Sequence, residues 1–295
     1  MRHVILGPGG IGGLIGACLA DSGETVTMVG RPEAMANYPT ELQLESPFGN
    51  LRVAVEHAAK VPPADLVWIA VKATQLEQSL TSFPDATGVR GIVPLLNGVD
   101  HIARLREKYR AELVIPATIA VESERVAPGH IVHRSPFAIL NVASSGRALL
   151  GDAITDFTKR GFTCRFIDDE ATLLWSKLVF LAPLALVSTA TGQVTGEFLS
   201  DPASREKVFR CVREACAVAT KEGATVDPEA VIANVSKLPP HMRSSMQKDV
   251  EQGKAPELGA IAGPILRGAA KHGIEVPVTR ELVEQVKKKV AARTA

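Results

Sequence analysis

The 295-residue sequence predicts an α/β protein with a doubly wound parallel sheet in its first part and only helices in its second. Short β-branched runs alternate with helical patterns up to residue 167, which is typical of parallel strands joined by helical crossovers. After Asp168 the strand signal disappears and helical patterns fill the remaining chain. A chain of this length, 46% hydrophobic, can bury a core in each part. We therefore expect two domains, residues 1–167 and 168–295.

Eight runs are expected to form the strands of the first domain. They are RHVIL, TVTMVG, LRVAVE, DLVWIAV, GIVPLL, LVIPATIAV, HIVHR and FTCRFI. Helices are expected at residues 10–21 and 101–109. The segment PGHIVHRSPFAILNV contains two apolar runs with no helix between them, which predicts an antiparallel hairpin at a sheet edge.

The second domain is expected to contain six helices. They cover residues 171–191, 201–223, 228–236, 244–252, 258–272 and 279–292. Gly223, Gly253 and Gly273 stand where three of these helices should stop. The last helix is amphipathic, which is compatible with a homodimer contact or with packing on its own domain.

Composition favours a small-molecule partner. The 33 Lys and Arg residues nearly balance 32 Asp and Glu residues, so no net field favours nucleic acid or an anionic membrane. Four scattered cysteines without a C-x-x-C pair, and an opening that reads directly as a strand, predict a cytoplasmic protein. The apolar run LLWSKLVFLAPLALVS is interrupted by Lys177 and Pro183, so we interpret it as a buried helix. His130 and His133 are expected on opposite faces of a strand, so no metal site is predicted.

A glycine-rich loop follows the first strand. Gly7, Gly9 and Gly12 form G-x-G-x-x-G, with Gly10 and Ile11 inside the motif, and a helix and a second strand follow. Such glycines permit a tight turn, close approach of backbone to a pyrophosphate, and close packing of helix on strand. In this strand-loop-helix-strand context, the motif predicts a Rossmann-type dinucleotide site.

The end of the second predicted strand favours NADPH over NADH. A free ribose 2′-hydroxyl is normally held by an acidic residue there, whereas this strand ends in MVGR, at Arg31. A guanidinium suits a 2′-phosphate. Glu33 is the competing feature, and after Pro32 we expect its side chain to point elsewhere.

Several short motifs, taken in order, resemble the ketopantoate reductase (2-dehydropantoate 2-reductase) family. They are VWIAVKATQ, VPLLNGV, LWSKL, RSSMQKD, PELGAIAG and KHGIEVPVTREL, and together with the glycine loop they extend over nearly the whole chain. The resemblance implies a Rossmann domain followed by a helical domain, and NADPH-dependent reduction of ketopantoate to pantoate or of a related substrate.

The resemblance also assigns individual roles. It places cofactor contacts at Lys72, Gln75, Asn97 and Glu257, a substrate contact at Ser245, and the catalytic, substrate-binding lysine at Lys177. An ammonium suits the reaction because it stabilises negative charge on the carbonyl oxygen and supplies a proton. Burial would lower the pKa of Lys177 and Glu257 would raise it, and the sequence leaves that balance open. Without the resemblance, a lysine in such a helix more often extends to water.

The sequence departs from the family at polar positions. Leu181, Ala185 and Thr195 stand where the family has asparagines, and PELGAIAG has Pro256, Gly259 and Ala262 in place of Thr, Asp and Asn. We interpret these as losses of substrate-facing donors, which predicts a bulkier or less hydroxylated 2-keto acid, or another carbonyl compound. Two other hypotheses stay open: another Rossmann-plus-helical hydroxy acid dehydrogenase, and a non-catalytic NADPH-binding regulator.

Overall fold

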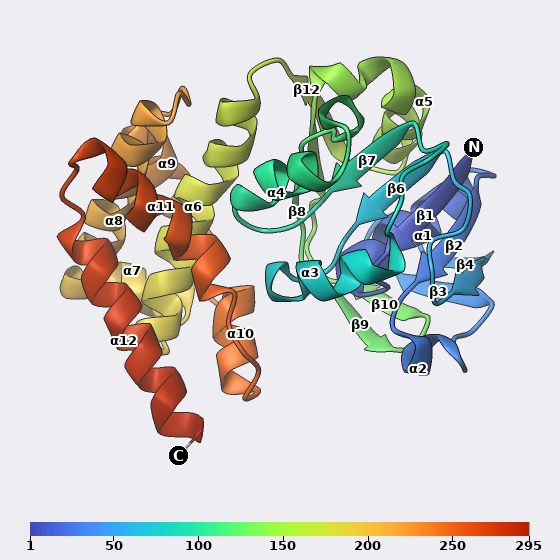
Figure 1. Cartoon of the computed structure of the whole chain (residues 1–295). Helices are drawn as coiled ribbons and strands as arrows, with labels where there is room; N and C mark the ends of the chain where they lie inside the picture. Colours follow the sequence, from blue (N-terminus) through green and yellow to red (C-terminus); the bar gives the residue numbers. More distant parts are fainter. Residues whose placement is uncertain (295) are drawn as a thin grey trace. The chain divides into compact units, whose positions relative to one another are not determined.

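The computed structural model describes residues 1–294, which form two compact units. One unit contains residues 1–96 and 101–173, and the other contains 97–100 together with the chain from Leu174 onward. Figure 1 shows both units, with labels on most of their helices and strands. The short segment Asn97–Asp100 is therefore separated in sequence from the rest of its unit.

A five-stranded parallel sheet forms the centre of the first unit. Its strands are β1 (Arg2–Leu6), β2 (Thr25–Val29), β5 (Glu56–Ala58), β6 (Leu66–Ile69) and β7 (Gly91–Pro94), in the order β5-β2-β1-β6-β7. The helix α1 (Gly10–Asp21) connects β1 to β2. Every residue of β6 is buried, as expected of a parallel strand covered on both faces. The predicted doubly wound sheet is confirmed.

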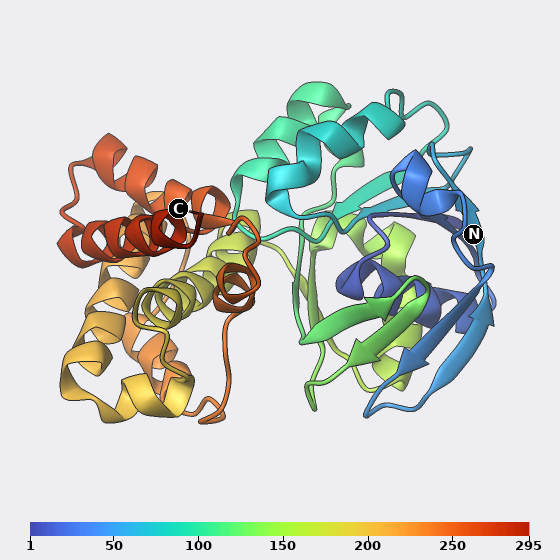
Figure 2. The same ribbon diagram turned by 90° about the horizontal axis from the view of Figure 1, so that it is seen from below.

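Two smaller sheets complete this unit. One has the order β4-β3-β10-β9, from β3 (Glu41–Glu45), β4 (Leu51–Ala54), β9 (Ser123–Ala127) and β10 (His130–His133). The other has the order β12-β11-β8, from β8 (Ala117–Ala120), β11 (Ile139–Ala143) and β12 (Thr163–Ile167), with α5 (Arg147–Lys159) joining its two parallel strands. The helix α1 contacts β9 and β10, and Figure 2 shows these strands beside it.

The hairpin predicted for PGHIVHRSPFAILNV is wrong. Its two runs form β10 and β11, which belong to different sheets. The partner of β10 in a hairpin is β9, and Gly129 makes the turn between them with a φ of 71°. The strand β9 was not predicted, because four of its five residues are exposed and no apolar alternation marks it.

Helices make up the second unit beyond Asn97–Asp100. They are α6 (Glu170–Thr191), which begins in the first unit, α7 (Thr195–Ser200), α8 (Pro202–Lys221), α9 (Pro228–Val235), α10 (Ser245–Glu251), α11 (Leu258–His272) and α12 (Pro277–Thr294). All six predicted helices are confirmed, whereas α7 was not predicted. Gly223, Gly253 and Gly273 have φ values of 93°, 70° and 64° just beyond helix ends, where glycine is favoured. The helix α8 contacts α7, α9, α11 and α12.

Short helical segments occupy the remaining connections. They are α2 (Pro32–Met35), α3 (Leu76–Ser79), α4 (Asp100–Lys108) and the 3₁₀ turns η1 (Ala73–Gln75), η2 (Leu80–Ser82), η3 (Ala111–Leu113) and η4 (Ser144–Gly146). The helix α4 corresponds to the helix predicted at residues 101–109.

The longest helix, α6, accounts for the most apolar stretch of the sequence. Of the helices in residues 1–294, it alone has the length and composition to cross a membrane, and 67% of its most apolar window is buried within the protein. Pro183 lies inside it. Burial in the protein explains most of its apolar character.

A buried histidine in β1 predicts acid sensitivity. The Nδ1 atom of His3 accepts a hydrogen bond from Trp68 Nε1 at 3.0 Å. Burial lowers the pKa of His3 from 6.5 to about 4, although Glu24 acts in the opposite direction. Between these values the unfolded chain binds the proton and the folded chain does not. We expect His3 to reduce the free energy of unfolding by about 3 kcal/mol as the pH falls through this window.

Urea unfolding at pH 7 and at pH 4.5 measures this effect. The variant His3→Gln keeps an acceptor for Trp68 but does not titrate, so it should lose less stability than the wild type over the same interval. Equal losses in both proteins would exclude His3 as the source.

Candidate functional site

The glycine loop has the geometry of a phosphate cradle. Gly7 has a φ of 105°, and a Cβ atom on it would lie 2.8 Å from the backbone nitrogen of Val71. A Cβ on Gly12 would lie 2.1 Å from the carbonyl oxygen of Gly7, whereas a Cβ on Gly9 would meet no atom within 4 Å. The loop is therefore tightly packed at Gly7 and Gly12 and open at Gly9, where a backbone that receives a ligand needs space.

The first turn of α1 is suited to an anion. Gly9 occupies the N-cap position without a capping side chain, and the first turn of the helix has no acidic residue. The leading amides of a helix point outward and carry partial positive charge. The predicted Gly10 and Ile11 contribute these amides. The residues of this loop thus fit the pyrophosphate of a dinucleotide.

Three other predicted cofactor residues lie in the same unit. Arg31 follows β2 and is exposed, and within residues 1–294 its guanidinium makes no hydrogen bond or ion pair. Lys72 and Gln75 follow β6, and the backbone N–H of Gln75 donates to the backbone carbonyl oxygen of Lys72 at 2.8 Å. Because β1, β2 and β6 are adjacent and parallel, their carboxyl ends bring the glycine loop, Arg31 and Lys72 to one edge of the sheet.

A second group of predicted residues meets inside the helical unit. Asn97 Nδ2 donates to Glu257 Oε2 at 3.0 Å, across 160 residues of sequence. Glu257 is 6% exposed and directly precedes α11. Gly98, with a φ of 84°, approaches the same helix so closely that a Cβ would lie 2.4 Å from the Ala260 carbonyl oxygen. This contact explains how Asn97 reaches Glu257.

Lys177 is the titratable group of this cluster. Burial lowers the pKa of its ammonium from 10.5 to about 8, and the nearby negative charge of Glu257 opposes that shift. The Lys177 side chain as a whole is only partly buried. Its ammonium group, however, lies in poorly solvated surroundings. Among the described residues this ammonium has no hydrogen-bond or ion-pair partner. Its N–H groups are free to donate to a ligand.

This pKa predicts the alkaline limb of activity. If the protonated lysine is the acid, kcat/KM should be constant below about pH 8 and fall tenfold per pH unit above it. Glu257→Gln removes the charge that raises the lysine pKa, so the limb should move to lower pH. Initial rates from pH 6 to 10 test both statements. An unchanged limb in the variant would exclude electrostatic coupling between the two residues.

The other substrate-side residues lie in different environments. Ser245 is exposed at the start of α10, while its neighbour Ser244 caps that helix and bonds to the Ser188 hydroxyl at 2.8 Å. Thr195 is buried, and its hydroxyl donates to the Met242 carbonyl oxygen at 2.8 Å. The Thr195 hydroxyl thus stabilises a loop of the protein itself.

The two positions that follow Lys177 on α6 also differ. Ala185 is completely buried, so its side chain is part of the helical core. Leu181 retains partial exposure, one turn beyond Lys177 on the same face. Leu181 is thus the apolar replacement that remains available to a ligand.

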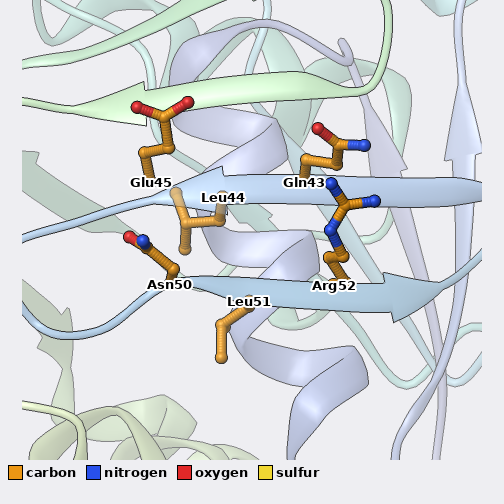
Figure 3. A pocket seen from close by; sticks show the side chains of 6 residues that line it. All are labelled: Gln43, Leu44, Glu45, Asn50, Leu51 and Arg52. Carbon is orange, nitrogen blue, oxygen red and sulfur yellow. The ribbon is translucent and has the colours of Figure 1, made fainter.

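A hollow of about 530 Å³ lies elsewhere, on β3 and β4 (Figure 3). It is lined by Gln43, Leu44, Glu45, Asn50, Leu51 and Arg52. None of the predicted site residues lies there, so we assign it no role in the reaction. In the described part of the chain, no three His, Cys, Asp or Glu side chains are grouped as metal ligands.

Comparison with known proteins places the chain among reductases. A family model described as ketopantoate reductase PanE/ApbA matches residues 3–144, and the C-terminal model of the same description matches 171–290. A 2-dehydropantoate 2-reductase from Caulobacter vibrioides is 30% identical over 292 residues, which cover 95% of this chain and 96% of the relative.

Solved structures agree in fold. The PanE/ApbA family ketopantoate reductase from Ralstonia eutropha has a TM-score of 0.88 at 25% identity, with 100% of both chains covered. A D-mandelate dehydrogenase solved with NADH and anilino(oxo)acetate has a TM-score of 0.88 at 20% identity, also with 100% of both chains covered. The predicted architecture, a Rossmann-type sheet followed by helices, is confirmed.

Proposed function

The chain belongs to the ketopantoate reductase family, and from this premise we propose that it reduces a 2-keto acid to a 2-hydroxy acid with NADPH. An oxidoreductase acting on CH–OH groups with a nicotinamide cofactor is the activity common to this family. The observation that carries the proposal is the cluster of Lys177, Glu257 and Asn97, in which a poorly solvated, unpaired ammonium lies near a buried carboxylate.

Each member of this cluster has a definite task. When bound, the reduced nicotinamide supplies a hydride to the keto carbon. The Lys177 ammonium stabilises the negative charge that develops on the keto oxygen and donates the proton that completes the hydroxyl group. Glu257 keeps the pKa of Lys177 from falling further, so that the lysine stays mainly protonated at neutral pH. Asn97 orients the Glu257 carboxylate by its hydrogen bond.

NADPH is the proposed cofactor because of the cation after β2. Arg31 is exposed and unpaired within the described residues, which suits a 2′-phosphate. A carboxylate directly after β2 would instead favour the 2′-hydroxyl of NADH.

An apolar side chain on the substrate is supported by Leu181. One turn from Lys177, this residue offers contact area and no hydrogen-bond donor. A hydroxylated substrate would leave its hydroxyl unpaired against such a wall, which costs more than a lost contact. We therefore propose that 2-keto acids whose branched or aromatic side chains carry no hydroxyl group are better substrates than ketopantoate.

NADPH oxidation with ketopantoate, 2-ketoisovalerate and phenylglyoxylate, repeated with NADH, tests the proposal. We expect turnover with NADPH and a higher kcat/KM for the two apolar acids. Leu181→Asn should shift the ratio towards ketopantoate by about tenfold, the value of one hydrogen bond. Absence of reduction with every acid, despite tight NADPH binding, would favour a regulator. A highest kcat/KM for ketopantoate would reject the apolar preference.

A further inference from the structure

Arg125 lies beside the glycine loop although it comes from a different sheet. It belongs to β9, and its Nη1 atom donates to the carbonyl oxygen of Pro8 at 3.2 Å. Pro8 stands between Gly7 and Gly9, in the middle of the phosphate cradle. A guanidinium has five N–H donors, so this one bond leaves most of them available.

The position of Arg125 is fixed by tight packing two residues earlier. The Ser123 hydroxyl donates to the Gly10 carbonyl oxygen at 2.9 Å. A Cβ atom on Gly10 would lie 2.1 Å from the Ser123 carbonyl oxygen, so the start of β9 and the start of α1 are in direct backbone contact. The hairpin therefore holds Arg125 in register with the loop rather than leaving it on a free surface.

Gly30, directly before Arg31, and Arg125 both approach the same loop residue, Pro8. Arg31 follows Gly30, on which a Cβ atom would lie 3.3 Å from the Pro8 ring, and Arg125 bonds to the Pro8 carbonyl oxygen from β9. The positive charge of Arg125 also interacts electrostatically with Tyr38, which lies just after α2. Burial raises the pKa of Tyr38, and Arg125 acts to lower it.

No carboxylate in the described residues pairs with either arginine. The acid nearest in sequence to Arg125, Glu124, is bonded to Arg134 at 3.2 Å. A guanidinium without a carboxylate partner can pair with a bound anion. Guanidinium groups are also the side chains best suited to phosphate oxygens.

We propose that Arg125 binds a phosphate group of the dinucleotide and forms, with Arg31, a two-arginine clamp around the glycine loop. The proposal rests on the proposed function, because it presupposes a nicotinamide dinucleotide in the first unit. It adds a binding residue contributed by the β9–β10 hairpin, outside the β1-α1-β2 motif.

Cofactor affinity of Arg125→Met tests the clamp. We expect the Kd for NADPH, measured by titration calorimetry at fixed ionic strength, to rise about tenfold or more, as for a lost charge-assisted bond. Arg134→Met is the matched control, since it removes the same charge directly after β10, at a residue paired with Glu124. Arg125→Lys should retain part of the affinity.

Titration with NADH identifies the phosphate. A loss confined to NADPH assigns Arg125 to the 2′-phosphate, equal losses for both cofactors assign it to the pyrophosphate, and either result supports the clamp. An unchanged Kd for both cofactors overturns it. So does an equal loss in Arg134→Met, or a fall in the cofactor-free melting temperature large enough to indicate a structural role.

Failure of the proposed function gives different results. A wild-type protein that binds neither cofactor overturns both proposals, whereas tight wild-type binding with an unaffected Arg125→Met variant overturns the clamp alone. Tight binding that depends on Arg125, without reduction of any keto acid, leaves the clamp standing and rejects the reductase.

Discussion

Replacement of Lys177 by methionine should lower turnover by about a hundredfold or more while leaving NADPH affinity nearly intact. Methionine has a similar length and removes the ammonium, so the keto oxygen loses both its stabilising charge and its proton donor. Removing a desolvated cation should also raise stability slightly, since burial is the main cause of the lowered pKa of Lys177. Steady-state kinetics and NADPH titration measure the two effects separately.

A control for this variant is Lys207→Met. Lys207 lies on α8 and pairs with Glu281 at 2.7 Å, outside the Lys177 cluster, so its removal should change kcat by less than about twofold. Wild-type turnover in Lys177→Met would contradict the assignment of the acid. A rise in KM at constant kcat would indicate that Lys177 serves only in binding.

Two alanine substitutions in the glycine loop should affect different properties, one the stability of the fold and the other the affinity for NADPH. Gly12→Ala places a Cβ atom 2.1 Å from the Gly7 carbonyl oxygen, so backbone must move and we expect a loss of about 3 kcal/mol or more in stability. Gly9→Ala meets no atom within 4 Å and keeps an allowed φ of −90°, so the protein should fold normally. Its methyl group would occupy the open side of the cradle and weaken NADPH binding about tenfold or more.

Melting temperature and NADPH titration distinguish the two variants. Gly151→Ala is the control for the exchange itself, because Gly151 lies within α5 with no atom near its Cβ direction, and alanine there should stabilise the helix by about 0.5–1 kcal/mol. Unimpaired NADPH binding by Gly9→Ala would mean that no ligand approaches that part of the loop.

Local patterns predicted most of this fold because they reflect local causes. The glycine motif ended one strand and began one helix, so the boundaries of α1 agreed with the prediction at both ends. The boundaries of α11 also agreed with the prediction, because apolar spacing and Gly273 define this helix. The strand β3 was missed although Leu42 and Leu44 alternate with polar residues, a signal that a period-two search would have found.

Contacts between distant segments could not be read in this way. Asn97, Glu257 and Lys177 were assigned by family resemblance, and the hydrogen bond from Asn97 to Glu257 depends on packing across 160 residues. The burial of Ala185 and Thr195 depends equally on neighbours that the local sequence does not specify. No sequence motif identified Arg125 as a site residue, because its position beside Pro8 results from the packing of the β9–β10 hairpin on Gly10 of α1.

The segment Asn97–Asp100 has a consequence for how such a protein can be divided. The chain leaves the first unit after Leu96, contributes four residues to the helical unit, and returns to the first unit at His101. A fragment that begins at Leu174 would contain Lys177 and Glu257 but not Asn97, and the backbone that lies against Ala260 would be missing. The helical unit is therefore not a transferable module, and recombination at the junction near Leu174 would separate the groups on which its chemistry depends.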